Sequence, residues 1–263
     1  MELDVPASAL SSPADPHHAV HALLAQGRAL WAQSQPAAAL ACFAQAQAQL
    51  AADAPAALQI RCCNALIAAW HPLEQWAQAQ ALAEATVLQH RHDPLAATRQ
   101  QLVHTFYLWA SLHDARQQPQ AELAVLNAMA QQFAADTDPV VRACLAQGLQ
   151  RRAITCQQLG HEQQALQAYA DLAEQFAADP NADTQHLVAQ SMLWLGEGLA
   201  RRQQLHEALA IWADLLRASA PHSEPRWHAL AAQALLHSAT ALAQLHRQDD
   251  ALLDHAALPH VHR

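Results

Sequence analysis

The sequence predicts an all-α protein in which about six helix hairpins stack as repeats. A phrase of alanine, leucine, two variable residues, a large residue and alanine recurs at 39–44, 165–170, 208–213 and 251–256. Successive copies begin 126, 43 and 43 residues apart, and 126 is three times 42. Periods of about 20–50 residues are typical of solenoids, whose repeats bury their apolar faces by stacking. Glycine contributes only 5 of 263 residues, alanine is abundant and runs of β-branched residues are few, which together favour helices over strands.

Proline, glycine and aspartate mark the ends of the predicted helices. Pro36 suits the first turn of a helix, where its missing N–H costs little, and Gly160 suits a bend. In order, the expected pairs are 18–33 with 36–51, 56–70 with 73–90, 95–116 with 119–135, 139–159 with 161–177, 184–203 with 205–219, and 226–245 with a short 248–258. We expect a flexible segment over 1–16, the solenoid over 17–258 and a tail over 259–263.

The recurring small and large residues have a packing explanation, because hairpins stack closely only where a small side chain faces a large one. The expected small positions on the first helices are Gly27, Ala65, Ala110, Ala153, Gly196 and Ala239. The large positions on the second helices are Phe43, Ala81 or Ala85, Leu126, Tyr169, Trp212 and His255. The register of the second repeat is open between Ala77 and Ala81, and Ala77 is preferred because Pro72 then lies near the turn.

These positions resemble the tetratricopeptide repeat (TPR) family. The fourth repeat shows the match. The family's small residue corresponds to Ala153, its glycine to Gly160 and its alanine to Ala165. The aromatic position corresponds to Tyr169 and the proline to Pro180. The period of 42–43 residues exceeds the usual period of about 34 and looks like the long-helix variants of bacterial regulators. The resemblance implies a right-handed α-α superhelix, a TPR-like solenoid, over roughly residues 18–258.

In such a superhelix the first helix of each pair lines a concave surface that holds the partner. Carrying over the family's positions, with neighbouring aromatic and charged residues, we expect the partner-binding residues to be Arg28, Trp31, His104, Tyr107, Asp114, Gln150, Gln157, Trp194, Glu197 and Arg201. Mixed aromatic, amide and charged side chains suit peptide capture, and tryptophan, tyrosine and arginine are frequent hot spots. Trp31 and Tyr107 could instead pack between repeats. The lysine and asparagine clamp of some family members is not carried over, because the chain has no lysine.

Composition narrows the class of partner. The formal net charge is −9 and no block of arginines occurs, which argues against nucleic acid. Glu2 and Asp4 stand where a signal peptide needs positive charge, and no stretch approaches 18 uninterrupted apolar residues. Five cysteines without a Cys-x-x-Cys pair suit a reducing compartment. We therefore expect a soluble protein of a bacterial cytoplasm, with no membrane partner.

Motifs for chemistry are missing from the sequence. It contains no glycine-rich phosphate loop, no Gly-x-Ser-x-Gly elbow and no His-Glu-x-x-His. The closely spaced histidines, such as His17 and His21, lack further ligands for a tetrahedral metal site. We expect no enzyme activity, no cofactor and no metal.

The sequence therefore predicts a non-catalytic scaffold or adaptor that binds a protein or peptide on its concave face. The alternative is a regulatory or sensor subunit, whose groove binds a small effector or signalling peptide and gates a partner protein. A solenoid with a short last repeat exposes apolar side chains such as Leu252, Leu253 and Leu258, which allows self-association through this end.

Overall fold

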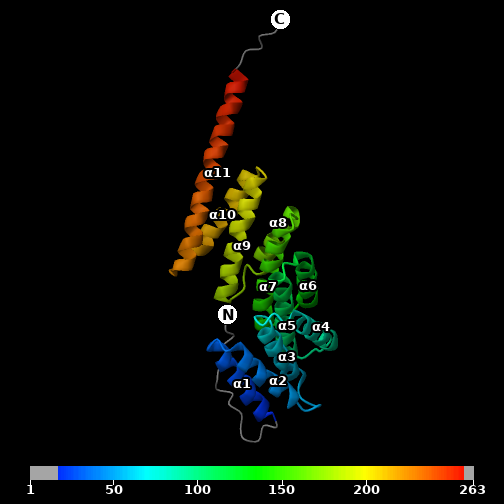
Figure 1. The fold of residues 1–263 in the computed structure, drawn as a ribbon. Helices are drawn as coiled ribbons and strands as arrows, with labels where there is room; N and C mark the ends of the chain where they lie inside the picture. The colour runs from blue at the N-terminus through cyan, green and yellow to red at the C-terminus, as the bar shows by residue number, and fades with distance from the viewer. Residues whose placement is uncertain (1–16, 258–263) are drawn as a thin grey trace. The chain divides into compact units, whose positions relative to one another are not determined.

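The computed structural model describes residues 17–257, with side chains through residue 247 (Figure 1). Within this range every regular element is an α-helix. The helices are α1 (His18–Ala32), α2 (Pro36–Ala48), α3 (Ala56–Trp70), α4 (Trp76–His90), α5 (Ala96–Ala115), α6 (Pro119–Phe133), α7 (Pro139–Gln158), α8 (Glu162–Gln175), α9 (Ala182–Arg201), α10 (Leu205–Ser219) and α11 (Pro225–Ala257). The all-α prediction is confirmed.

The chain forms two compact units that divide within α7, the first ending at Cys144 and the second beginning at Leu145. The first unit contains the hairpins α1–α2, α3–α4 and α5–α6. The second contains the carboxyl half of α7 with α8, the hairpin α9–α10, and α11. The segments 1–16 and 259–263, expected to be a flexible lead-in and a tail, lie outside the described residues.

The first five predicted hairpins are present, and their ends lie close to the expected residues. The sixth is wrong, because α11 runs as one helix from Pro225 to Ala257. It passes without a break through residues 246 and 247, where a turn was expected. Residues 246–250 contain no glycine or proline that would end a helix, so local propensity favours continuation.

All five hairpins turn in the same way. One residue in each turn has a positive φ, between 55° and 74°: Ser34, Glu74, Gln117, Gly160 and Gln203. The Gly160 N–H donates to the Gln157 carbonyl at 3.0 Å and the His161 N–H donates to the Cys156 carbonyl at 2.9 Å. These two bonds define a Schellman motif, and the other four turns repeat them. Only one of the five turns uses glycine, so four of them give no glycine signal in the sequence.

The turns fix the register of the second repeat. In the other four hairpins the small or equivalent position of the second helix lies five residues after the positive-φ residue, as Ala165 follows Gly160. In the second repeat this residue is Ala79, which is fully buried. Both expected choices, Ala77 and Ala81, were therefore wrong by two residues, because the turn residue that sets the count is Glu74, which gives no glycine signal in the sequence.

Small and large residues interlock as expected in two hairpins where the first helix carries glycine. A Cβ on Gly27 would lie 2.2 Å from the Phe43 ring, and a Cβ on Gly196 would lie 2.3 Å from Nε1 of Trp212. In the second repeat the pattern is inverted. The corrected register pairs Ile67 on α3 with Ala83 on α4, both fully buried in one core cluster, in place of the expected Ala65 with Ala81 or Ala85.

Candidate functional site

The turns also locate the residues that the family resemblance assigns to the concave surface. These residues lie 13, 10, 6 and 3 positions before the positive-φ residue of each turn, and we call them the inner-face positions. In α1 they are His21, Leu24, Arg28 and Trp31. In α3 they are Arg61, Asn64, Ala68 and His71, which the sequence reasoning missed because the register there was ambiguous.

The first unit has an apolar pocket of about 270 Å³ at the carboxyl ends of α1, α3 and α5. Trp31 is 39% exposed and lines it. The other lining residues are Ile67, Ala68, His71, Pro72, Leu108 and Leu112. Of the predicted site residues in this unit, the pocket therefore includes Trp31 alone. Such a pocket can accept a large apolar side chain.

Positive charge collects along the inner-face positions of α1 and α3. The Arg61 guanidinium on α3 contacts Nδ1 of His21 on α1. Burial, and next the charge of Arg28, lower the pKa of Arg61. Between residues 17 and 73 the sequence has a single carboxylate side chain, Asp53. The inner-face positions of α1 and α3 therefore form a locally cationic surface in an acidic protein.

The remaining predicted residues of the first unit are half-buried on α5. They are His104, Tyr107 and Asp114. Burial lowers the pKa of His104, so this side chain favours its neutral form. Asn64 serves the fold, since its amide donates to the Gln101 carbonyl at 2.9 Å and accepts from the Thr105 hydroxyl at 2.7 Å. These bonds tie α3 to α5.

Amide and aromatic groups occupy the corresponding positions of the second unit. The Gln150 amide on α7 donates to Gln190 on α9 at 3.0 Å. Gln157 accepts from the Tyr169 hydroxyl at 3.1 Å, and the Tyr169 ring packs against Trp194 with centroids 5.5 Å apart. Gln157 and Trp194 thus have structural partners. Burial first, and the charge of Glu197 second, raise the pKa of Tyr169.

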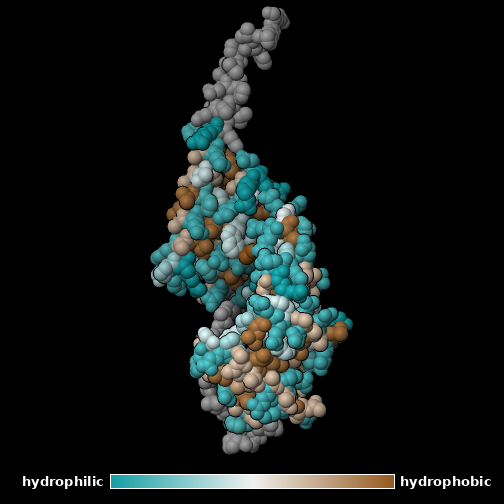
Figure 2. Space-filling view, viewed as in Figure 1, coloured by the Kyte–Doolittle hydropathy of each residue, from teal (hydrophilic) through white to brown (hydrophobic). Residues whose placement is uncertain are grey.

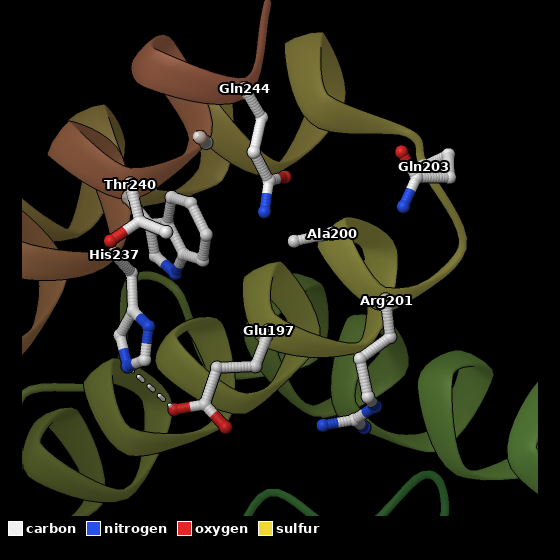
Figure 3. Close-up of a pocket in the computed structure, with 9 residues that line it drawn as sticks. Glu197, Ala200, Arg201, Gln203, His237, Thr240 and Gln244 are labelled. Atoms are coloured by element: carbon white, nitrogen blue, oxygen red, sulfur yellow. Dashed lines mark ion pairs between the residues drawn. The ribbon is translucent and has the colours of Figure 1, made fainter.

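A pocket of about 300 Å³ lies between α9 and α11 of the second unit. The Glu197 carboxylate and Nε2 of His237 form an ion pair at 3.1 Å across it (Figure 3). The His237 ring stacks on Trp212, with centroids 5.4 Å apart. In Figure 3 the Gln244 amide reaches from α11 toward the pocket, and Arg201 lies at its edge.

This pocket joins two predicted residues, Glu197 and Arg201, to two that the sequence did not indicate. His237 and Gln244 were missed because they lie on α11, outside the positions carried over from the family. Arg201 also lies 3.8 Å from Glu162 at an exposed ion pair. Carboxylate, guanidinium, imidazole and amide groups here can hydrogen-bond a peptide backbone or a polar ligand.

The described residues offer neither a metal-binding cluster nor a membrane-spanning helix. Among residues with described side chains, no group of three or more histidine, cysteine, aspartate or glutamate residues could hold a metal ion. Over the same part of the chain, helices of sufficient length lack the apolar character needed to cross a bilayer. The five cysteines are all free thiols.

Comparison with solved structures identifies the fold. The apo form of RapI superposes with a TM-score of 0.65 at 11% identity over 81% of this chain, which spans 56% of RapI. The TPR-like repeats of a putative kinesin light chain from Podosopora anserina give 0.58 at 16% identity, covering 79% of this chain and 98% of theirs.

A signal transduction ATPase with a tetratricopeptide repeat sensor, from Pyrococcus horikoshii, gives 0.59 at 10% identity, covering 84% of this chain and 32% of its own. No protein-family model matches the sequence, and no curated protein matches it. The chain therefore has a TPR-like solenoid fold, as the sequence predicts, and identities this low show the fold alone.

Proposed function

We propose that this protein is a non-catalytic scaffold that binds a protein or peptide segment at its inner-face positions. The observation that carries the proposal is that both units place a pocket there beside charged or amide side chains. The partner-binding set comprises Arg28, Trp31, His104, Tyr107, Asp114, Gln150, Gln157, Trp194, Glu197 and Arg201, extended by Arg61, His71, His237 and Gln244. We assign the protein to a reducing, cytoplasmic compartment because its cysteines are unpaired.

The two pockets select different features of a bound segment. In the first unit, Arg28 and Arg61 favour an acidic side chain, and the Trp31 pocket favours a large apolar one nearby. In the second unit, Glu197 and Arg201 flank amides that suit the polar groups of a peptide backbone. An acidic segment with an interspersed leucine or aromatic residue fits the first surface best.

A test begins with peptides selected from a random library on the full-length protein. We expect Trp31→Ala to raise the Kd of peptides that contact the pocket of the first unit by about tenfold, which is about 1.4 kcal/mol. Glu197→Gln should raise the Kd of peptides that contact the pocket between α9 and α11 by a similar factor. Gln45→Ala on α2 and Glu174→Gln on α8, both exposed, are matched controls that should leave the Kd unchanged. Peptides that bind all four variants as tightly as the parent would contradict the proposal.

The second candidate function is a sensor, in which the pocket between α9 and α11 binds a small effector. Its volume of about 300 Å³ lies at the lower end of the range for small-molecule sites, about 300–1,000 Å³, and the contact between Glu197 and His237 spans it. The Pyrococcus horikoshii ATPase, whose repeats are described as a sensor, shares this fold. A thermal shift with a small polar ligand that Glu197→Gln abolishes, together with failure to select peptides, favours this candidate.

A further inference from the structure

Two oppositely charged side chains border the pocket between α9 and α11 without pairing with each other. Glu197 and Arg201 stand four residues apart on α9, and a glutamate that precedes a basic residue by this spacing is well placed for an ion pair within a helix. In the structure, however, Glu197 lies 3.1 Å from Nε2 of His237. Arg201 turns instead to Glu162, at 3.8 Å. Figure 3 accordingly marks an ion pair at His237 and none between Glu197 and Arg201.

The Glu197 carboxylate is held in position and keeps an oxygen for a further donor. Its contact with His237 uses Oε1, and the His237 ring is itself fixed by stacking on the buried Trp212. Among residues with described side chains, no other hydrogen bond or ion pair engages Glu197. A carboxylate can accept several hydrogen bonds, so Oε2 of Glu197 can accept from an ammonium group, which has three N–H donors.

The Arg201 guanidinium also keeps donors for a ligand. Its pair with Glu162 joins side chains that are 55% and 50% exposed, and such exposed pairs contribute little to stability. A guanidinium has five N–H groups and can bind a carboxylate through two parallel hydrogen bonds. A carboxylate on a ligand can therefore bind Arg201 beside Glu162 or in its place.

The rest of the pocket is uncharged. Ala200, Thr240 and Ala241 line it with small side chains, and Gln203 and Gln244 contribute amides. Its volume of about 300 Å³ suits a single small molecule. Hydrophilic side chains predominate over α8 and α9 on the face that Figure 2 shows, so a charged molecule approaches across a polar surface.

We propose that this pocket binds a free α-amino acid with an uncharged polar side chain, such as glutamine. The ammonium group of the ligand binds Oε2 of Glu197, its carboxylate binds Arg201, and its side-chain amide binds Gln244. Both charged groups of an α-amino acid are attached to one carbon atom, which suits two residues whose Cβ atoms lie about 5–6 Å apart on neighbouring turns. The end of a peptide supplies only one of these charges. The inference rests on the second candidate function, because it names the effector that the sensor binds.

The first experiment is calorimetry of the full-length protein with L-glutamine. We expect saturable binding of one molecule per chain. N-acetyl-L-glutamine lacks the ammonium group and L-glutaminamide lacks the α-carboxylate, so each should bind at least about tenfold more weakly. L-glutamate and L-lysine carry a third charge that the pocket does not match, and they should also bind more weakly. No binding of L-glutamine, or equal affinities for L-glutamine and its two derivatives, would overturn the proposal.

A second experiment matches each charged group of the ligand to its residue. Arg201→Gln should weaken the binding of L-glutamine by about tenfold and leave the affinity for L-glutaminamide unchanged, because that ligand lacks the group that Arg201 binds. Glu197→Gln should act in the same way on L-glutamine and N-acetyl-L-glutamine. Arg202→Gln, at the exposed neighbouring arginine, is the control and should bind as the parent does. Equal weakening of all three ligands by Arg201→Gln would refute the assigned contacts.

These outcomes are distinct from failure of the proposed functions. Selected peptides that depend on Trp31, with no amino acid bound, would overturn this inference and leave the scaffold function in place. A thermal shift with a different small polar ligand that depends on Glu197 would overturn it and retain the sensor function. Binding of L-glutamine that Arg201→Gln weakens would support the inference whether or not peptides are selected.

Discussion

The second and fifth repeats carry the large residue of the contact between their two helices on opposite helices. In the fifth, Gly196 on the first helix makes room for Trp212 on the second. In the second, the large residue, Ile67, lies on the first helix and the small one, Ala83, on the second. Stacked hairpins therefore constrain the volume shared by the two positions, and either helix can supply the larger side chain.

Removing the large residue of either repeat should change the free energy of unfolding more than any other variant considered below. Trp212→Ala should lower the free energy of unfolding by about 3–5 kcal/mol, and Ile67→Ala by about 2–5 kcal/mol, because each leaves a cavity in a buried interface. Chemical denaturation followed by circular dichroism measures both. A loss below about 1 kcal/mol at Ile67 would show that the second repeat is not packed through this pair.

Moving the large residue across the interface sharpens the same comparison. The double variant Ile67→Ala with Ala83→Leu gives the second repeat the arrangement of the fifth. We expect it to recover most of the stability lost in Ile67→Ala, ending within about 1.5 kcal/mol of the parent. Ala83→Leu alone, with Ile67 retained, is the control and should destabilise by overpacking. Additive losses in the double variant would refute the idea of a shared volume.

Adding one methyl group tests how tightly the fifth repeat is closed. Gly196→Ala places a Cβ against the buried Trp212 ring and should cost about 1–3 kcal/mol. Gly198→Ala is the matched control on the same helix, where the new Cβ meets Cδ2 of Leu166 at 2.2 Å. The end of a leucine side chain can turn aside more easily than an indole, so we expect a smaller loss. Equal losses would contradict this view of the interface.

The turns provide a smaller and opposite effect. Gln203→Gly removes the strain of a positive φ and should raise the free energy of unfolding by about 0.5–1 kcal/mol, and Gln117→Gly should do the same. Gly160→Ala should cost about 1 kcal/mol although no atom lies within 4 Å of the new Cβ. Thermal denaturation checks all three, and a destabilised Gln203→Gly would contradict the role given to these turns.

The smallest expected effect is a pH dependence in the first unit. Burial lowers the pKa of His104, so below its ordinary value of about 6.5 the unfolded chain binds more protons than the folded chain. The free energy of unfolding should be greatest above that pH and fall as the solution is acidified. His104→Gln should flatten part of this slope in urea titrations at several pH values. A slope identical to that of the parent would exclude His104 as a source.

Part of the candidate site could be predicted from sequence. Trp31, Glu197 and Arg201 were identified because their repeats have a clear register, and the structure places all three beside pockets. Arg61 and His71 were missed because the second repeat has neither a turn glycine nor an aromatic residue at the position that fixes the count. His237 and Gln244 depend on how α11 packs on α9, which no local pattern records.

The sequence by itself determined the helices, their approximate ends and the repeating hairpin, because alanine, proline and glycine act on the backbone within a few residues. Only the tertiary structure decided that Ala79 and Ile67 hold the second repeat's packing positions and that α11 does not turn back. Those outcomes depend on volumes matched between side chains on different helices, and on which surfaces remain to be covered.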